Sequence, residues 1–227
     1  MFLQETRCTA EQVPAMEFAG LGYKTHAVGQ TGGRNGVAVL SRIPFEVLAE
    51  ALPGDAEDTQ ARYIEVAAAG IRAAGIYLPN GNPQPGPKFD YKLKWFDRLH
   101  ARAADLMELE IPLVLAGDYN VIPTDADIAN ARSMMDDALM QPESRAAFRR
   151  LAMLGLTDAL EARHPKAGLW TFWDYQAGAW QRNNGIRIDP LLLSPQAADR
   201  LKSVEIDKDM RAREKPSDHV PIRIELA

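Results

Sequence analysis

Residues 89–120 read FDYKLKWFDRLHARAADLMELEIPLVLAGDYN and predict a helix, a strand and a polar turn in succession. Apolar side chains recur every three or four positions from Phe89 to Leu106, which is the period of an amphipathic helix. The following run, 111–116, is apolar on both faces and is typical of a buried strand. The polar GDYN sequence at 117–120 then ends the strand, at the kind of position where catalytic groups are found in layered α/β proteins.

Short apolar runs predict further strands on both sides of this segment. The runs before it span residues 36–40, 62–66 and 71–78, and those after it span 169–175, 186–193, 203–206 and 220–226. A second helix is predicted over 143–154. Strands at both ends with helices between them indicate an α/β protein whose sheets pack in layers under helices. Without repeats or a linker, we expect one domain over 1–227.

The composition limits the possible classes of protein. The chain has 26 Lys and Arg against 31 Asp and Glu, so the net charge of −5 argues against coating nucleic acid by bulk electrostatics but permits a local basic groove. Its single cysteine excludes an internal disulfide, which favours a reducing compartment. Its start lacks a signal-peptide pattern, and its apolar runs fall short of the ~20 residues that span a bilayer. We therefore expect a cytoplasmic protein with no membrane partner.

Five polar clusters stand at or near the ends of apolar runs. They are LQET at 3–6, YLPNG at 77–81, GDYN at 117–120, RID at 187–189 and SDH at 217–219. Each has a purely structural alternative, since an acid can start a helix and Asp, Asn or Ser can form local turns. The glycines of 29–36 lack the Lys-Ser/Thr ending of a phosphate-binding loop and precede a strand, so they predict a hairpin turn.

Asp189 is the acid that is hardest to explain structurally. It lies between Ile188 and a Leu-Leu-Leu run, where a carboxylate is costly to bury without a partner. His219 is a candidate partner, because a carboxylate bound to one imidazole nitrogen favours the charged ring and leaves the other nitrogen facing a reacting anion. A histidine with a structural role only is the alternative.

Glu5, Asp118 and Asp218 offer an all-oxygen ligand set. Such a set suits Mg²⁺ or Mn²⁺, whereas one cysteine and four scattered histidines give a zinc site little support. Asn120 adds an amide that can donate to a phosphate oxygen. These groups match phosphodiester hydrolysis, which needs a cation, a carboxylate that activates water and donors for the developing charge.

Six motifs in this order resemble the exodeoxyribonuclease III family of the endonuclease/exonuclease/phosphatase superfamily. They are LQET (3–6), NGVAVLSR (35–42), YLPNG (77–81), GDYN (117–120), GIRIDPLLLS (185–194) and EKPSDHVP (214–221). The resemblance implies a four-layered α/β-sandwich of the DNase I type, with two packed, mostly antiparallel sheets flanked by helices. It also implies a monomeric, Mg²⁺-dependent DNA repair nuclease that incises abasic sites and trims double-stranded DNA, including damaged 3′ ends, in the 3′ to 5′ direction.

The same resemblance implies roles for the residues of the motifs. Glu5 resembles the metal ligand, with Asp118, Asn120 and Asp218 beside it in the metal site. Asp118 further resembles the carboxylate that activates water, and Asn120 the amide that positions the phosphate. The remaining catalytic groups are the phenol of Tyr77 and the pair Asp189 and His219, which resembles the carboxylate and imidazole that stabilise the pentacovalent phosphorus.

Substrate contacts are implied for six further residues. Phe172 and Trp173 resemble the aromatic pair that lines a pocket for an abasic sugar, with a core position as the alternative. The polar contacts are Arg62, Asn80, Lys88 and Lys92. For the three basic residues the alternative is a solvated surface charge without a role in binding. Lys88, Lys92, Arg98 and Arg102 are predicted to form a basic helix face that favours nucleic acid.

Relatives have a further strand before LQET, which ends in an asparagine of the active site. Its absence here predicts an N-terminally truncated relative whose neighbouring strands expose backbone groups and apolar surface. Two alternatives to a DNA nuclease stay open. One is a superfamily enzyme that acts on a phosphoinositide or sphingolipid headgroup, and the other is a DNA-binding relative that does not cut.

Overall fold

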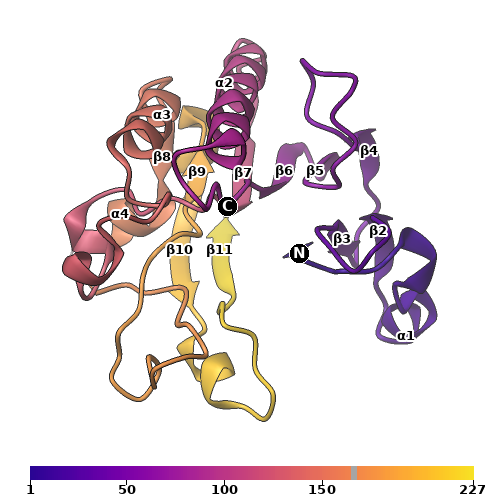
Figure 1. The fold of residues 1–227 in the computed structure, drawn as a ribbon. Coiled ribbons are helices and arrows are strands. Elements are labelled where there is room, and N and C mark those ends of the chain that lie inside the picture. Colours follow the sequence, from indigo (N-terminus) through magenta and orange to yellow (C-terminus); the bar gives the residue numbers. More distant parts are fainter. Residues whose placement is uncertain (165–167) are drawn as a thin grey trace.

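The structure is a computed structural model that describes residues 1–164 and 168–227, and its centre is a six-stranded sheet (Figure 1). In sheet order the strands are β4 (Glu46–Ala49), β5 (Tyr63–Ala68), β6 (Ile71–Tyr77), β7 (Leu113–Asp118), β9 (Leu191–Leu193) and β8 (Thr157–Asp158). Neighbours are antiparallel except for β6 and β7, which are parallel. Parallel neighbours need a crossover, and α2 (Pro87–Met107) supplies it.

Two smaller sheets form the second β layer. One has the order β1 (Phe2–Gln4), β3 (Val37–Ser41) and β2 (Lys24–Val28), and the other pairs β10 (Leu201–Ile206) with β11 (Ile222–Leu226). All their pairings are antiparallel. In the described part of the chain, β1 and β11 each pair on one side and are edge strands. The layered fold is therefore as predicted, but its second sheet is divided in two.

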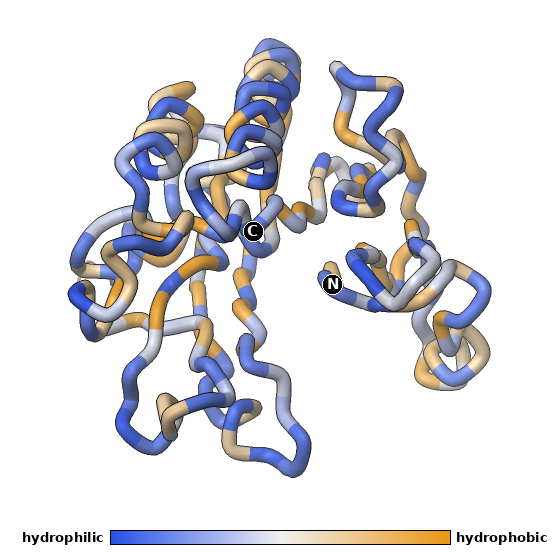
Figure 2. Tube along the Cα trace, in the orientation of Figure 1, coloured by the Kyte–Doolittle hydropathy of each residue, from blue (hydrophilic) through white to orange (hydrophobic). Residues whose placement is uncertain are grey.

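Helices cover the other face of the six-stranded sheet. α2 and α3 (Pro142–Ala152) pack there, with apolar side chains of both in the core, and Figure 2 shows hydrophobic and hydrophilic positions alternating along their turns. Pro87 is at the first turn of α2, where its missing N–H costs nothing. The short helices are α1 (Ala15–Gly20), α4 (Ala159–Arg163), α5 (Pro195–Ala198) and the 3-10 turns Ala10–Gln12, Asp125–Asp127, Ala131–Met134 and Lys208–Ala212. None of the helices in the described residues is long and apolar enough to cross a membrane.

Most of the predicted elements are confirmed, including both long helices and the strands β3, β5, β6, β7, β10 and β11. Residues 29–36 join the antiparallel strands β2 and β3, as a hairpin turn should. The predicted strand at 169–175 is wrong, because Phe172 forms isolated bridges only. The Thr171 side chain explains this locally: its hydroxyl accepts the Ile188 N–H at 3.1 Å, in place of a backbone carbonyl of a regular ladder.

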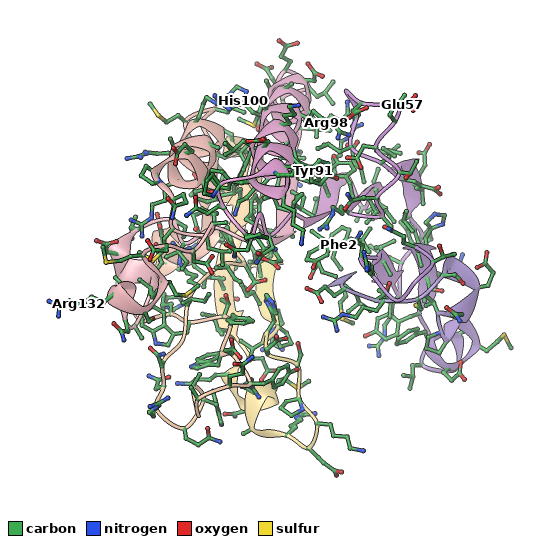
Figure 3. The ribbon with its side chains drawn as sticks, viewed as in Figure 1. Phe2, Glu57, Tyr91, Arg98, His100 and Arg132 are labelled. Carbon is green, nitrogen blue, oxygen red and sulfur yellow. The ribbon has the colours of Figure 1, made fainter. Side chains whose placement is uncertain are left out.

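The predicted basic face of α2 is also wrong. The Arg98 guanidinium donates to Asp58 at 2.6 Å, and the Tyr91 hydroxyl from the same helix donates to that carboxylate at 3.0 Å. Figure 3 shows both side chains extending from α2 toward the loop after β4. The Arg102 guanidinium pairs with the buried carboxylate of Glu65. These charges are neutralised inside the protein, so they give no support for a nucleic-acid surface on α2.

Candidate active site

The register of β6 and β7 places Tyr77 beside Asp118 at the same edge of the sheet. Glu5 follows β1, in the layer that packs against this sheet, and its backbone has a left-handed φ of 51°. The Tyr77 hydroxyl donates to Glu5 Oε1 at 2.6 Å. Residues from three separate motifs therefore meet at one place, although Glu5 and Asp118 lie far apart in the sequence.

Asp118 and Asn120 form a local turn at the end of β7. The Asn120 backbone N–H donates to Asp118 Oδ1 at 2.7 Å, and its side-chain amide donates to Asp118 Oδ2 at 2.9 Å. The same amide donates to the Leu78 carbonyl at 2.8 Å, so both of its hydrogens have protein partners. In this arrangement Asn120 holds the Asp118 carboxylate, and a contact from Asn120 to phosphate requires one of these bonds to open.

His219 connects two of the acids. Its Nδ1 lies 3.0 Å from each oxygen of Asp189, and its Nε2 lies 3.9 Å from Asp118 Oδ2. The Phe172 ring packs edge-on against the imidazole, with 4.9 Å between ring centroids. The imidazole keeps 27% of its side-chain surface exposed, so a substrate can reach it. The predicted pairing of Asp189 with His219 is present, with Nε2 directed toward the site.

The charged and buried groups of this cluster shift the pKa values of His219 and Asp118. Burial lowers the pKa of His219, but the carboxylates, Asp189 first, outweigh burial and raise it above its usual range. The imidazole is thus a cation at neutral pH. Burial also raises the pKa of Asp118; the His219 charge opposes this rise, while Asp189 and Glu5 add to it. A buried carboxylate with a raised pKa is a stronger base than an exposed one.

Glu5 stays ionised. Burial raises its pKa, but hydrogen bonds from Tyr77 and Arg7 outweigh burial, so the net shift is downward. Burial and the bond to Glu5 both raise the pKa of Tyr77, so the phenol keeps its proton and donates it. The Arg7 guanidinium binds Glu5 Oε2 with its Nε at 3.0 Å, and 67% of the Arg7 side chain is exposed. Arg7 is therefore an exposed partner of Glu5, on the solvent side of the carboxylate.

A divalent cation fits this donor set only loosely. Among residues 1–164 and 168–227, no group of three or more His, Cys, Asp or Glu side chains is close enough to hold a metal ion. Mg²⁺ commonly binds through one or two carboxylates, keeps several waters and completes its shell on substrate phosphate. Glu5 is the group that would hold it here. Asp218 contributes charge, since it raises the pKa of His219, and its carboxylate accepts from the Ser217 hydroxyl at 3.4 Å.

Three of the predicted substrate contacts lie where DNA could reach them. Asn80 is exposed and donates to Asn120 Oδ1 at 3.0 Å. The Arg62 guanidinium stacks 4.7 Å from the centre of the Tyr77 ring. Lys88 is exposed in the first turn of α2. Their contact with a substrate stays a prediction.

The prediction that Lys92 contacts the substrate does not fit the structure, and neither does its alternative, a surface charge. The side chain is fully buried, and its ammonium group donates to backbone carbonyls, among them that of Asn80 at 3.0 Å. Burial lowers the pKa of Lys92 to about 7, although Asp118 and Asp137 act in the opposite direction. Its position on α2 did carry a signal, because Lys92 lies three residues after Phe89 and four before Phe96, on the buried face of the helix.

The predicted aromatic pair is divided in the structure. Phe172 contacts His219, but Trp173 is 1% exposed and packs edge-on against Trp180, with 5.0 Å between ring centroids. Successive residues of an extended segment point to opposite sides, which explains the separation. The prediction that Trp173 lines the pocket is therefore wrong, and the core alternative holds for it.

Two contributors to the site were not predicted from the sequence. Arg7 neutralises part of the Glu5 charge, and Asn82 donates through Nδ2 to Asn80 Oδ1 at 2.8 Å. Each lies two positions after the residue that it contacts. Neither segment is extended, since Glu5 and Arg7 have φ angles of 51° and 52° and Gly81 has a φ of 92°, so the sequence spacing did not predict these contacts.

Residues 1–219 match the Endonuclease/Exonuclease/phosphatase family. The chain belongs to this family. It is 33% identical to the exodeoxyribonuclease III of Haemophilus influenzae, over 99% of this chain and 88% of that protein. The resemblance found in the six motifs is thus confirmed, and with it the prediction of an exodeoxyribonuclease III-like hydrolase.

Two solved structures share the fold closely. One is the 3′ phosphatase NExo from Neisseria bound to a product DNA hairpin, with a TM-score of 0.96 and 36% identity over 100% of this chain and 88% of that one. Another is an AP endonuclease from Archaeoglobus fulgidus, with a TM-score of 0.93 and 31% identity over 99% and 87%. The predicted DNase I-like fold class is confirmed.

Proposed function

We propose that this protein is a divalent-cation-dependent DNA repair nuclease that hydrolyses phosphodiester bonds at abasic sites and at 3′ ends. The observation that carries the proposal is His219, with one ring nitrogen on Asp189 at 3.0 Å and the other directed at Asp118, 3.9 Å away. A cationic imidazole beside a basic carboxylate suits a reaction in which water loses a proton while phosphorus gains negative charge.

Each residue has a defined part in this mechanism. Asp118, held by the Asn120 amide, takes the proton from water as the water attacks phosphorus in line. The P–O bond opposite the water breaks, and the leaving oxygen takes a proton from solvent. His219 donates from Nε2 to a phosphoryl oxygen, and Asp189 keeps the ring charged and oriented. Glu5, fixed by Tyr77, would hold Mg²⁺ or Mn²⁺, which when bound polarises a phosphoryl oxygen as a Lewis acid.

DNA as the substrate is supported by the relatives. The similar proteins are an exodeoxyribonuclease III, an AP endonuclease and a 3′ phosphatase bound to a DNA hairpin. The arginines of α2 give no such support, since they pair inside the protein. A lipid-headgroup phosphodiesterase would use the same carboxylates and imidazole, so the substrate has to be tested directly.

The test is incubation of the purified chain with three duplexes, which carry an abasic site, a 3′ phosphate or a plain recessed 3′ end. Each is assayed with Mg²⁺ and with EDTA, and phosphatidylinositol phosphate and sphingomyelin vesicles are assayed in parallel. We expect Mg²⁺-dependent cutting of DNA alone. Faster hydrolysis of either lipid than of the DNA duplexes would favour a lipid-headgroup phosphodiesterase. If the chain binds the abasic duplex but does not cut it with any cation tested, it is a DNA-binding relative without catalytic activity.

A further inference from the structure

Lys92 lies directly beneath the candidate active site. Its ammonium group donates to the Asn120 carbonyl, to the Asn80 carbonyl at 3.0 Å and to the Ala138 carbonyl at 3.4 Å. These acceptors belong to three segments that follow β6, follow β7 and precede α3. The Lys92 amino group therefore has three backbone carbonyls within hydrogen-bond distance. It joins three loops at one point.

The chain makes room for this side chain at Gly81. A Cβ at this position would lie 2.6 Å from Lys92 Cδ, and Gly81 has a φ of 92°, which L side chains rarely adopt. The loop after β6 therefore closes over the lysine stem because residue 81 has no side chain. The arrangement is specific to a long, unbranched side chain that ends in a compact set of donors.

Both asparagines joined in this way carry side chains of the site. Asn80 donates to Asn120, and Asn120 in turn donates to Asp118 at 2.9 Å. Asn120 also has a left-handed φ of 46°, a conformation that asparagine tolerates better than most residues. The Lys92 amino group binds the Asn120 carbonyl and so fixes this backbone two residues from Asp118.

We propose that Lys92 is a positioning residue, which orients the Asn80 and Asn120 amides and through them the Asp118 carboxylate. The proposal rests on the phosphodiesterase function proposed above. Lys92 does not touch the substrate, so its loss should change the rate of the chemical step more than substrate binding. A misplacement of reacting groups by about 1 Å costs on the order of 10²-fold in rate.

The test compares Lys92→Met, which keeps the stem and removes the ammonium group, with Lys94→Met on the exposed side of the same helix. We expect kcat on an abasic duplex to fall by roughly 10²-fold in Lys92→Met, with KM within about threefold of the parent. Lys94→Met should retain both constants. Rates are divided by the folded fraction from circular dichroism and measured at two temperatures, one of them well below the melting transition of either variant.

Three outcomes overturn the positioning role. They are a parent-like kcat in folded Lys92→Met, an increase in KM alone, and a loss that disappears once the folded fraction is taken into account. If Lys92→Met does not fold, Lys92→Arg replaces it, because arginine keeps a cationic side chain but changes the geometry of the N–H donors. A parent-like kcat in folded Lys92→Arg would also overturn the positioning role. A parent and a Lys94→Met chain that both fail to cut would overturn the proposed function itself, and the positioning role with it.

Discussion

Asp118 shows at the scale of one residue how a site can conflict with stability. The side chain is 6% exposed, and burial raises its pKa, which means that the folded protein disfavours the charged form. The carboxylate is nonetheless the group that the proposed mechanism needs as a base. Removal of its charge should therefore have opposite effects on activity and on folding.

We expect Asp118→Asn to lower kcat on DNA by roughly 10²- to 10⁴-fold, because an amide cannot accept the proton of water. In EDTA the same variant should melt at or above the temperature of the parent, since its neutral side chain costs less to bury. Steady-state kinetics and thermal denaturation check the two effects. Asp105→Asn, which changes an exposed acid of α2, is the control and should alter neither. Full Mg²⁺-dependent cutting by Asp118→Asn would refute the role of Asp118.

Glu5→Gln tests the cation site. The amide keeps an oxygen for the Tyr77 hydroxyl but loses the charge that attracts a divalent ion, so the Mg²⁺ concentration for half-maximal rate should rise by roughly tenfold or more. A titration of the initial rate with Mg²⁺ measures the change. Glu17→Gln alters an exposed acid of α1 and should leave the titration as it is. An unchanged Mg²⁺ dependence in Glu5→Gln would place the cation elsewhere.

At the scale of elements, a buried carboxylate joins α2 to the sheet. Glu65 on β5 is fully buried and accepts from Arg72 of β6 at 2.6 Å, from Arg102 of α2 at 3.0 Å and from the Tyr63 hydroxyl at 2.7 Å. Removal of one partner of such a group is costly, because the remaining charges lose their counter-ion.

We expect Glu65→Gln to lower the free energy of unfolding by about 3 kcal/mol at pH 7. Burial raises the pKa of Glu65, but the donors, Arg102 first, outweigh burial and hold it below its usual value of 4.5. The stabilisation is thus complete above about pH 4.5 and is lost as the pH falls through the lower folded-state pKa. Urea unfolding at neutral pH and at a pH well below 4.5 measures both effects, with Glu46→Gln as an exposed control on β4. Equal losses at the two pH values would contradict this explanation.

At the scale of the whole molecule, Phe2 links the small N-terminal sheet to the six-stranded sheet. Figure 3 shows Phe2 between the two parts, and its ring packs against apolar residues of both β layers. Gly75 on β6 leaves the space for this ring, since a Cβ there would lie 2.5 Å from Phe2 Cδ1. The position of Glu5, three residues after Phe2, depends on this contact.

We expect Gly75→Ala to destabilise the protein by roughly 1–3 kcal/mol, because the added methyl group overpacks the contact with Phe2. In a Phe2→Leu background, which removes the ring, the same substitution should cost clearly less. A double-mutant cycle by chemical denaturation measures this coupling. Additive effects would show that Gly75 and Phe2 act independently.

The sequence by itself determined the helix that it predicted from Phe89, the strand before GDYN and the family, because these depend on periodicity and on motifs of a few adjacent residues. It also predicted the pairing of Asp189 with His219, since a carboxylate in an apolar run needs a partner. Tertiary structure alone decided which partners the charges of α2 meet. Glu65 reaches Arg102 from a strand distant in sequence, and backbone carbonyls of three loops reach Lys92, so helical periodicity could not identify these partners. Which distant segments pack against a residue is not contained in its local sequence.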